Sequence, residues 1–304
     1  MSGGVLTAGD EAPPIAIGGV GGSGTRLVAE LVRALGVHTG DDLNSASDTL
    51  CFTLLFKLRD APDWPDARFD ASVSALRAGL RRGRPLDDAL RERVSELSAG
   101  DRPGHPVRWL QDRARRLFES AAAPAHGRRW GWKEPNTHII IDRLWRYLPE
   151  LRYVHVVRHG VDMAFSRNQN QVRLWGPAIL GTDAPLTPQR SLAYWCNTQR
   201  RAQRLLADNP HRMFWLDYDA LCARPVEEMQ KLCTFLGADI GDALPLLPDV
   251  RPPGTSRHAN EDLSVFADED LDYVRSLGYR IETASLDARS VQADSIGQPA
   301  QARR

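Results

Sequence analysis

The stretch from Ile15 to Val32 places glycines where a chain could bind a phosphate group. It reads IAIGGVGGSGTRLVAELV: a short apolar run, a glycine-rich turn and then apolar residues at helical spacing. Backbone N–H groups at the amino end of a helix face outward, and the helix dipole favours an anion there. Gly19 and Gly24 also have the G-x-x-x-x-G spacing of phosphate-binding loops. The stretch therefore predicts an anion site, although a glycine-rich turn that serves only tight packing is the alternative.

The two residues after Gly24 separate this loop from loops that bind ATP with magnesium. Those loops continue with Lys, which reaches the phosphates, and with a Ser or Thr that binds the metal. Here the two residues are Thr25 and Arg26. Arg26 falls in the first helical turn, where its guanidinium could fork onto phosphate oxygens. We predict a loop for a phosphate compound other than ATP, formed by Gly22, Ser23, Gly24, Thr25 and Arg26.

A second group of polar residues follows another apolar run, in YVHVVRHGVDMAFSRN. Arg158 ends the run, Asp162 can cap the helix that follows, and Ser166 lies one turn inside that helix. Arg158 and Ser166 would then converge at the carboxyl end of a strand. A guanidinium, which can donate two parallel hydrogen bonds, suits a phosphate monoester when a hydroxyl lies beside it. The alternative is a surface ion pair and an unrelated helical serine.

These residues need a sheet to position them, and the sequence predicts one. Four short apolar runs, at 15–19, 129–133, 153–158 and 212–218, are typical of buried parallel strands. Helical patterns follow the first run and cover 136–148, 189–207 and 225–236. Strands that alternate with helices indicate an α/β fold with a parallel sheet covered on both faces. Ligands of such sheets bind at the carboxyl ends of the strands.

The segment 57–127 breaks this alternation. It contains three helical patterns separated by Pro and Gly, and it predicts a helical cap inserted between two strands, over the ligand cleft. Residues 1–13 predict a flexible leader and 285–304 a disordered tail, because neither has apolar periodicity. The domain between them would span 14–284. Aromatic residues of the cap region could line an acceptor pocket or pack its core: Phe52, Phe56, Trp64, Phe69 and Trp109.

The composition places the chain among ordinary globular proteins. It has 304 residues, of which 42% are hydrophobic and 26% charged, and its formal net charge is zero at pH 7. A neutral chain is not expected to bind nucleic acid by charge alone. Its four cysteines lack metal-ligand spacing, and no apolar run approaches the roughly 18 residues of a membrane span. We expect a cytoplasmic protein with reduced thiols; the sequence does not determine its oligomeric state.

GGSGTR near the start and VRHGVDMAFS later resemble motifs of the PAPS-dependent sulfotransferases, where PAPS is 3′-phosphoadenosine 5′-phosphosulfate. The segments WLDYDALCARPVEEMQKLCTFLG and PPGTSRHANEDLSVF are similar to later motifs of that family, the second to those of bacterial members. The resemblance implies a P-loop-NTPase-like fold, PAPS as co-substrate and no required metal. It implies that the first loop holds the 5′-phosphosulfate. The residues implied for the 3′-phosphate are Arg158, Ser166, Ser256 and Arg257.

The tyrosylprotein-type members offer the nearest match for the catalytic residues. Lys133, in WGWKEP, matches a lysine that would neutralise the oxygen from which the sulfuryl group departs; the alternative is a simple pair with Glu134. The acidic motif of that type corresponds to Gly40-Asp41-Asp42, which implies Asp42 as general base and Asp41 as the next candidate. A solvated acidic turn is the alternative. His38 and His138 are further candidates.

Two departures limit the match to the tyrosylprotein-type members. Their loop has Arg before Ser-Gly, whereas Gly22 stands there in this chain. The insertion 57–127, moreover, has no residue pattern that assigns it an acceptor. The arrangement of the cytosolic aryl sulfotransferases is also absent, because Pro135 occupies the place of the histidine that serves as their base. We therefore predict sulfuryl transfer to a hydroxyl, with an amine as second choice, on a small molecule or glycan rather than on protein tyrosine. The alternatives are an ATP-dependent small-molecule kinase and a nucleotide-binding module without turnover.

Overall fold

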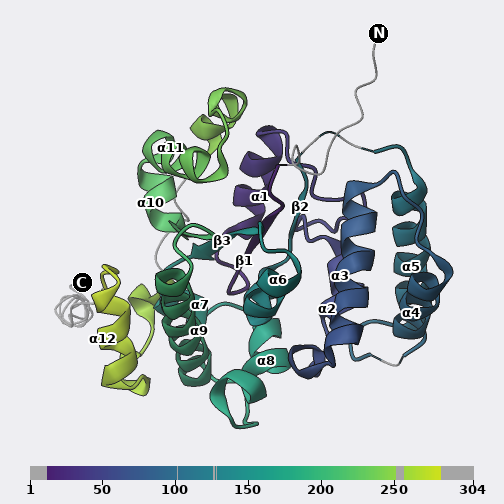
Figure 1. Cartoon of the computed structure of the whole chain (residues 1–304). Helices are drawn as coiled ribbons and strands as arrows, with labels where there is room; N and C mark the ends of the chain where they lie inside the picture. The colour runs from purple at the N-terminus through teal and green to yellow at the C-terminus, as the bar shows by residue number, and fades with distance from the viewer. Residues whose placement is uncertain (1–11, 101, 126, 128, 251–256, 282–304) are drawn as a thin grey trace, which may run out of the picture.

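A four-stranded parallel sheet forms the centre of the structure. The computed structural model describes residues 12–100, 102–125, 127, 129–250 and 257–281. Its strands are β1 (Ile15–Gly19), β2 (Gly131–Lys133), β3 (Arg152–Val157) and β4 (Met213–Asp217), in the order β2-β1-β3-β4 (Figure 1). The four predicted strands and their parallel arrangement are confirmed, with β2 two residues shorter at its start than predicted. Because β1 is central, the loop that follows it lies between the ends of β2 and β3.

Side chains alternate between the two faces of the sheet, and each face is covered by helices. Ile17 and Val156 point into a cluster shared with α1 (Thr25–Ala34), α11 (Pro225–Leu236) and the 3₁₀ segment η3 (Gly241–Asp249). Trp132 and Tyr153 point into the opposite cluster. The helices on that side are α6 (Ile141–Tyr147), α7 (Gly160–Ala164), α8 (Asn170–Leu180), α9 (Pro188–Asp208) and α12 (Asp268–Ser276) (Figure 1).

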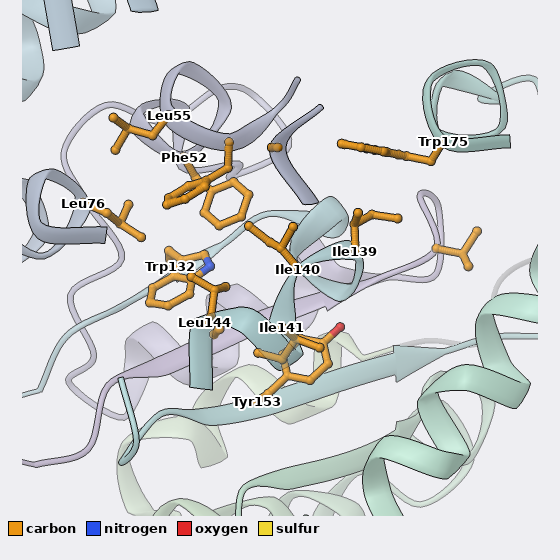
Figure 2. Packing of buried hydrophobic residues seen from close by; sticks show 14 of the residues in the cluster. Phe52, Leu55, Leu76, Trp132, Ile139, Ile140, Ile141, Leu144, Tyr153 and Trp175 are labelled. Atoms are coloured by element: carbon orange, nitrogen blue, oxygen red, sulfur yellow. The ribbon is translucent and has the colours of Figure 1, made fainter. Parts of the chain in front are cut away.

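The region predicted as a cap is helical and packs beside β2. Its helices are α3 (Asp66–Arg81), α4 (Asp88–Ala99) and α5 (Val107–Ala122), preceded by α2 (Leu50–Phe56) and the 3₁₀ turn η1 (Ala61–Asp63) (Figure 1). Figure 2 shows Phe52 of α2 against Trp132 of β2, with ring centroids 6.1 Å apart and Leu76 of α3 nearby. This apolar contact joins the cap helices to the sheet. Phe52, Phe56, Trp64 and Phe69 are all buried in that cluster.

The single helix predicted over 136–148 is wrong. The chain forms a 3₁₀ turn, η2 (Pro135–Ile139), breaks at Ile140 with φ −121°, and only then begins α6. Polar side chains hold the turn: Glu134 accepts from the N–H of Asn136, and Trp132 donates to the hydroxyl of Thr137. The break also buries three consecutive isoleucines, which a continuous helix would spread around its axis (Figure 2).

The remaining described elements are short, and the ends of the chain are not described. They are α10 (Tyr218–Ala223), η4 (Arg257–Asn260) and η5 (Leu263–Val265). The predicted tail and all but residues 12 and 13 of the predicted leader lie outside the described residues. Among the described helices, none is both long enough and apolar enough to cross a bilayer.

Candidate active site

The glycine loop joins β1 to α1 at the carboxyl edge of the sheet, as the sequence predicts. Gly22 and Gly24 have φ angles of +94° and +95°, which L side chains rarely adopt. The N–H groups of Gly22, Gly24 and Thr25 make no hydrogen bond within the described chain. Ser23 is buried, and its hydroxyl is also without a partner there. The loop therefore presents several unused donors at a helix amino terminus, the arrangement that binds anions.

Gln171 fixes the first half of this loop, and the sequence analysis missed it. Its side-chain amide donates to the carbonyl of Gly19 across 3.2 Å and accepts from the N–H of Gly21 at 2.9 Å. Gln171 lies in the first turn of α8 and is buried. It thus ties α8 to the loop and uses the N–H of Gly21, which leaves anion binding to the later N–H groups. No periodic or motif signal marks a glutamine for this contact.

Arg158 and Ser166 meet at the same loop. The predicted helix is shorter than expected: Asp162 lies inside α7 rather than capping it, and Ser166 follows the helix rather than lying inside it. Arg158, directly after β3, donates from Nη1 to the carbonyl of Gly22 at 3.3 Å, and its Nε is buried without a partner among the described residues. The Ser166 hydroxyl oxygen lies 3.9 Å from the position a Cβ would occupy on Gly22. Tyr218, at the start of α10, covers the other side: the Arg158 guanidinium carbon is 5.5 Å from its ring centroid. The structure therefore brings the two predicted anion-binding motifs together.

Lys133 flanks the loop from the opposite side. It pairs with Ile17 of β1 in parallel register, so both side chains point to the α1 face of the sheet. Its ammonium contacts the carboxylate of Asp48 and donates to the carbonyl of Ala46 at 2.9 Å. Lys133 is buried, whereas Asp48 is partly accessible. The alternative pairing with Glu134 is wrong, because Glu134 points to the other face and lies near Lys57.

Two further predicted cations stand at the margin of the site. The Arg26 side chain is 64% exposed and lies 4.0 Å from Glu30, one turn further along α1, rather than against the loop. Arg257 begins η4 and is exposed; its Nη1 donates to the carbonyl of Asp162 in α7 at 3.5 Å. Since α7 follows Arg158, Arg257 is brought to the same end of the sheet. Ser256 lies outside the described residues.

The predicted base, Asp42, forms a partly buried ion pair with the cap. Its carboxylate accepts from Arg113 of α5 at 2.8 Å, and its other oxygen is buried without a hydrogen bond among the described residues. Burial raises the pKa of Asp42, although Arg113 and Arg116 oppose the rise. Asp41 accepts from the Ser120 hydroxyl at 3.3 Å, also on α5. Both acids thus connect the turn to the cap, and the solvated acidic turn is wrong for Asp42.

The other two candidates for the base, His38 and His138, make contacts that stabilise the fold. His38 forms an isolated parallel bridge with Trp130, just before β2. His138 is buried, and its ring packs edge-on against those of His155 and Tyr194. Burial lowers the pKa of His138 well below its usual range. Both surroundings are those of structural residues.

Three residues beside Arg158 have the composition of a metal site. The ligand atoms of His159, Asp162 and His258 lie within 4.8 Å of one another. Two of them already join η4 to α7: Asp162 accepts from the backbone N–H of His258 at 3.1 Å and lies 2.8 Å from its Nδ1. The other histidine, His159, is bonded through Nε2 to the carbonyl of Arg280. These contacts hold η4, and with it Arg257, next to the loop.

Comparison with models of protein families matches residues 13–242 to the family described as the sulfotransferase family. The chain belongs to the sulfotransferase family. This confirms the family that the motifs resemble. No curated protein matches the sequence at a significant level.

Solved sulfotransferases with similar folds are distant in sequence. The sulfotransferase domain of the Synechococcus PCC 7002 olefin synthase is 16% identical, with 91% of this chain and 100% of that chain covered and a TM-score of 0.46. A sulfotransferase from Alicyclobacillus acidocaldarius is 18% identical, with 91% and 98% covered and a TM-score of 0.45. STF9 from Mycobacterium avium is 16% identical, with 90% and 78% covered and the same TM-score. The family model, rather than these scores, identifies the sulfotransferase.

Proposed function

We propose that this sulfotransferase moves a sulfuryl group from PAPS to a hydroxyl, with an amine as second choice, of a small molecule or glycan. The contact between Arg158 and Gly22 carries the proposal. It places a buried cation with an unused Nε beside a loop in which the N–H groups of Gly22, Gly24 and Thr25 are also unused among the described residues. Buried donors without partners are costly unless a ligand satisfies them. The phosphate groups of PAPS have the charge and the acceptor oxygens to do so.

The charge of the donor matches the cations around the loop. PAPS carries about four negative charges near neutral pH, counting the second ionisation of its 3′-phosphate. We assign the 5′-phosphosulfate to Gly22, Ser23, Gly24, Thr25 and Lys133, and the 3′-phosphate to Arg158, Ser166 and Arg257. Arg26 could join the first group if it leaves Glu30. Side-chain cations and a helix terminus can stabilise such charges without magnesium.

The proposed reaction is an in-line substitution at sulfur. The acceptor oxygen forms a bond to sulfur while the bond from sulfur to the bridging phosphate oxygen breaks. That oxygen keeps the electron pair, and adenosine 3′,5′-bisphosphate leaves. Lys133 neutralises the charge that develops on the leaving oxygen, and a carboxylate accepts the acceptor's proton. Positioned cations and a positioned base both act mainly in the transition state.

Two carboxylates could accept the proton, and their contacts separate them. Asp42 contacts Arg113, which also contacts Asp112, so Asp42 belongs to a network of ion pairs with α5. Asp48 contacts Lys133, the residue assigned to the leaving oxygen, and 19% of its side chain is accessible. We therefore assign the role of general base to Asp48. Asp42 as base stays a prediction from the sequence.

Calorimetry on the full chain tests the donor. Adenosine 3′,5′-bisphosphate, ADP, ATP and AMP are titrated with and without magnesium. We expect the bisphosphate to bind at least tenfold more tightly than the others without metal, a difference of about 1.4 kcal/mol. A magnesium-dependent preference for ATP would contradict the proposal and support a kinase. Tight binding of the bisphosphate without transfer from PAPS to any member of a broad acceptor panel would support a module without turnover.

A further inference from the structure

A cavity of about 670 Å³ opens between the cap and α8, outside the loop just described. One wall is the turn that follows α2, the second is the turn between α4 and α5, and the third is the first part of α8. Its apolar surface comes from side chains such as Leu58 and Leu174. This volume falls in the range, about 300–1,000 Å³, of sites for small organic ligands.

Two walls of the cavity are connected to the proposed donor site through neighbouring residues. Lys57 lines it, and its ammonium is 3.7 Å from Glu134, the residue after Lys133. Asn170 lines the opposite wall, and the next residue, Gln171, holds the glycine loop. One wall thus contacts the residue that follows Lys133, and another wall contains the residue that precedes Gln171. A ligand in the cavity would be a neighbour of a donor bound on the loop.

The charge of the lining is strongly positive. Four lining residues are Lys or Arg, whereas Asp60 is the one acid among them, and it lies 3.8 Å from Arg68. The Lys57 charge is partly offset by Glu134. Arg173 is exposed, and its guanidinium has one weak contact at 3.5 Å, to Asn170. It is therefore the cation most available to a ligand.

The other two arginines of the lining are fixed by hydrogen bonds to backbone carbonyls. Arg59 donates to the backbone carbonyl of Arg173 at 2.9 Å and so connects the cap to α8 across the cavity. Arg102 is buried and donates to the carbonyls of Thr53 and Leu54, while its Nε is buried without a partner among the described residues. Burial lowers the pKa of Arg102 to about 10, so it is still charged at pH 7. Its fixed charge raises the potential of the cavity.

We propose that this cavity holds the acceptor and that the acceptor is an organic acid: an apolar body that carries an oxyanion group and the accepting hydroxyl. The oxyanion pairs with Arg173, within the field of Arg59 and Arg102, and the apolar body lies on Leu58 and Leu174. The role as acceptor rests on the proposed sulfuryl transfer. A positive pocket with apolar walls selects such a molecule over its neutral analogue, because the neutral analogue leaves the cations without a counter-charge.

The test uses 6-hydroxy-2-naphthoate and its methyl ester, which share the ring and the hydroxyl and differ in charge. Calorimetry on the full chain, without donor, compares wild type with Arg173→Gln, Arg173→Lys and the control Arg146→Gln. Arg146 is exposed on α6, which precedes β3 and so lies toward the amino edge of the sheet. We expect wild type and Arg146→Gln to bind the acid at least tenfold more tightly than the ester. Arg173→Gln reduces this ratio below threefold, and Arg173→Lys keeps most of it.

Equal binding of acid and ester by the wild type, or no binding of either at millimolar concentration, would overturn the proposal. A preference for the acid that survives Arg173→Gln would overturn it as well, since the acid would then bind elsewhere. Thermal unfolding confirms that each variant is folded. A separate titration with adenosine 3′,5′-bisphosphate distinguishes the two proposals. If that nucleotide binds and the wild type does not prefer the acid over the ester, the cavity assignment alone fails. If the acid is preferred and the nucleotide does not bind, the cavity assignment stands and the proposed PAPS site fails.

Discussion

The Arg158 guanidinium donates to the carbonyl oxygen of Gly22 across 3.3 Å and thereby joins two motifs that are 136 residues apart in the sequence. The bond fixes the end of β3 against the loop after β1. Its donor and its acceptor both belong to the proposed nucleotide site, so the contact orders the site before any ligand enters. Preorganised charges of this kind cost no rearrangement when an anion binds.

Arg158→Ala removes this cation. We expect affinity for adenosine 3′,5′-bisphosphate to fall roughly 10- to 150-fold, because a hydrogen bond to a charged group contributes about 1.5–3 kcal/mol. Calorimetry measures the change. Arg146→Ala is the matched control, since Arg146 is exposed on α6, which leads into the amino end of β3, the end opposite to Arg158. Equal affinity in Arg158→Ala and wild type would remove Arg158 from the site.

Gly24→Ala tests the shape of the loop. Gly24 has φ +95°, and an added Cβ would lie 2.1 Å from Cδ2 of Tyr218. We expect nucleotide binding to be lost and the protein to be destabilised by more than the about 1–2 kcal/mol of a left-handed alanine alone. Gly36→Ala separates the two effects, because Gly36 also has positive φ (+80°) but no atom within 4 Å of the added Cβ. Urea unfolding and calorimetry on both variants make the comparison; equal losses would show that Tyr218 does not matter.

Asp48→Asn and Asp42→Asn distinguish the two acids. If Asp48 accepts the proton, its substitution lowers kcat of sulfuryl transfer by roughly 10²- to 10⁴-fold, the usual contribution of a general base. Affinity for the bisphosphate should change little. Asp42→Asn should instead lower the free energy of unfolding modestly, because it removes one of the two carboxylates that contact Arg113, the other being that of Asp112. The reverse pattern, with kcat lost in Asp42→Asn and retained in Asp48→Asn, would return the role of base to Asp42.

His155 makes stability depend on pH. Its imidazole is buried between the hydroxyl of Tyr153, 2.9 Å from Nδ1, and the amide oxygen of Gln199, 2.8 Å from Nε2. Burial lowers the pKa of His155 from 6.5 to about 4. Between those values the unfolded chain binds a proton that the folded chain does not, so the free energy of unfolding falls as pH falls from 6.5 to 4. One such group contributes at most about 1.4 kcal/mol per pH unit.

Urea unfolding at pH 7, 6 and 5 measures this dependence. We expect His155→Gln, which cannot take up the proton, to have a shallower fall than wild type. The matched control is His211→Gln, because His211 is exposed and should leave the slope unchanged. An unchanged slope in His155→Gln would show that other groups cause the acid sensitivity.

Local sequence determined the order of the elements and the two motifs proposed to bind anions. The apolar runs predicted all four strands because buried parallel strands are apolar throughout, and the glycines with Thr25 predicted the turn into α1. The spacing of Arg158 and Ser166 placed both at one strand end. These features depend on residues close together in the chain. The 3₁₀ turn before α6 was missed because side chains distant in the sequence also hold it: Trp175 donates to the side chain of Asn136, and Arg201 donates to the carbonyl of His138.

Only the tertiary structure decided which partners the functional side chains have. It placed Gln171 on the glycine loop, Asp48 on Lys133 and Arg113 on Asp42, and it turned Arg26 toward Glu30. It also formed the positive cavity from three separate turns and helices. Such contacts join residues that no periodicity relates, and they follow from the packing of cap, loop and sheet. The sequence could therefore identify the chemistry of this site before the structure identified the residues that position it.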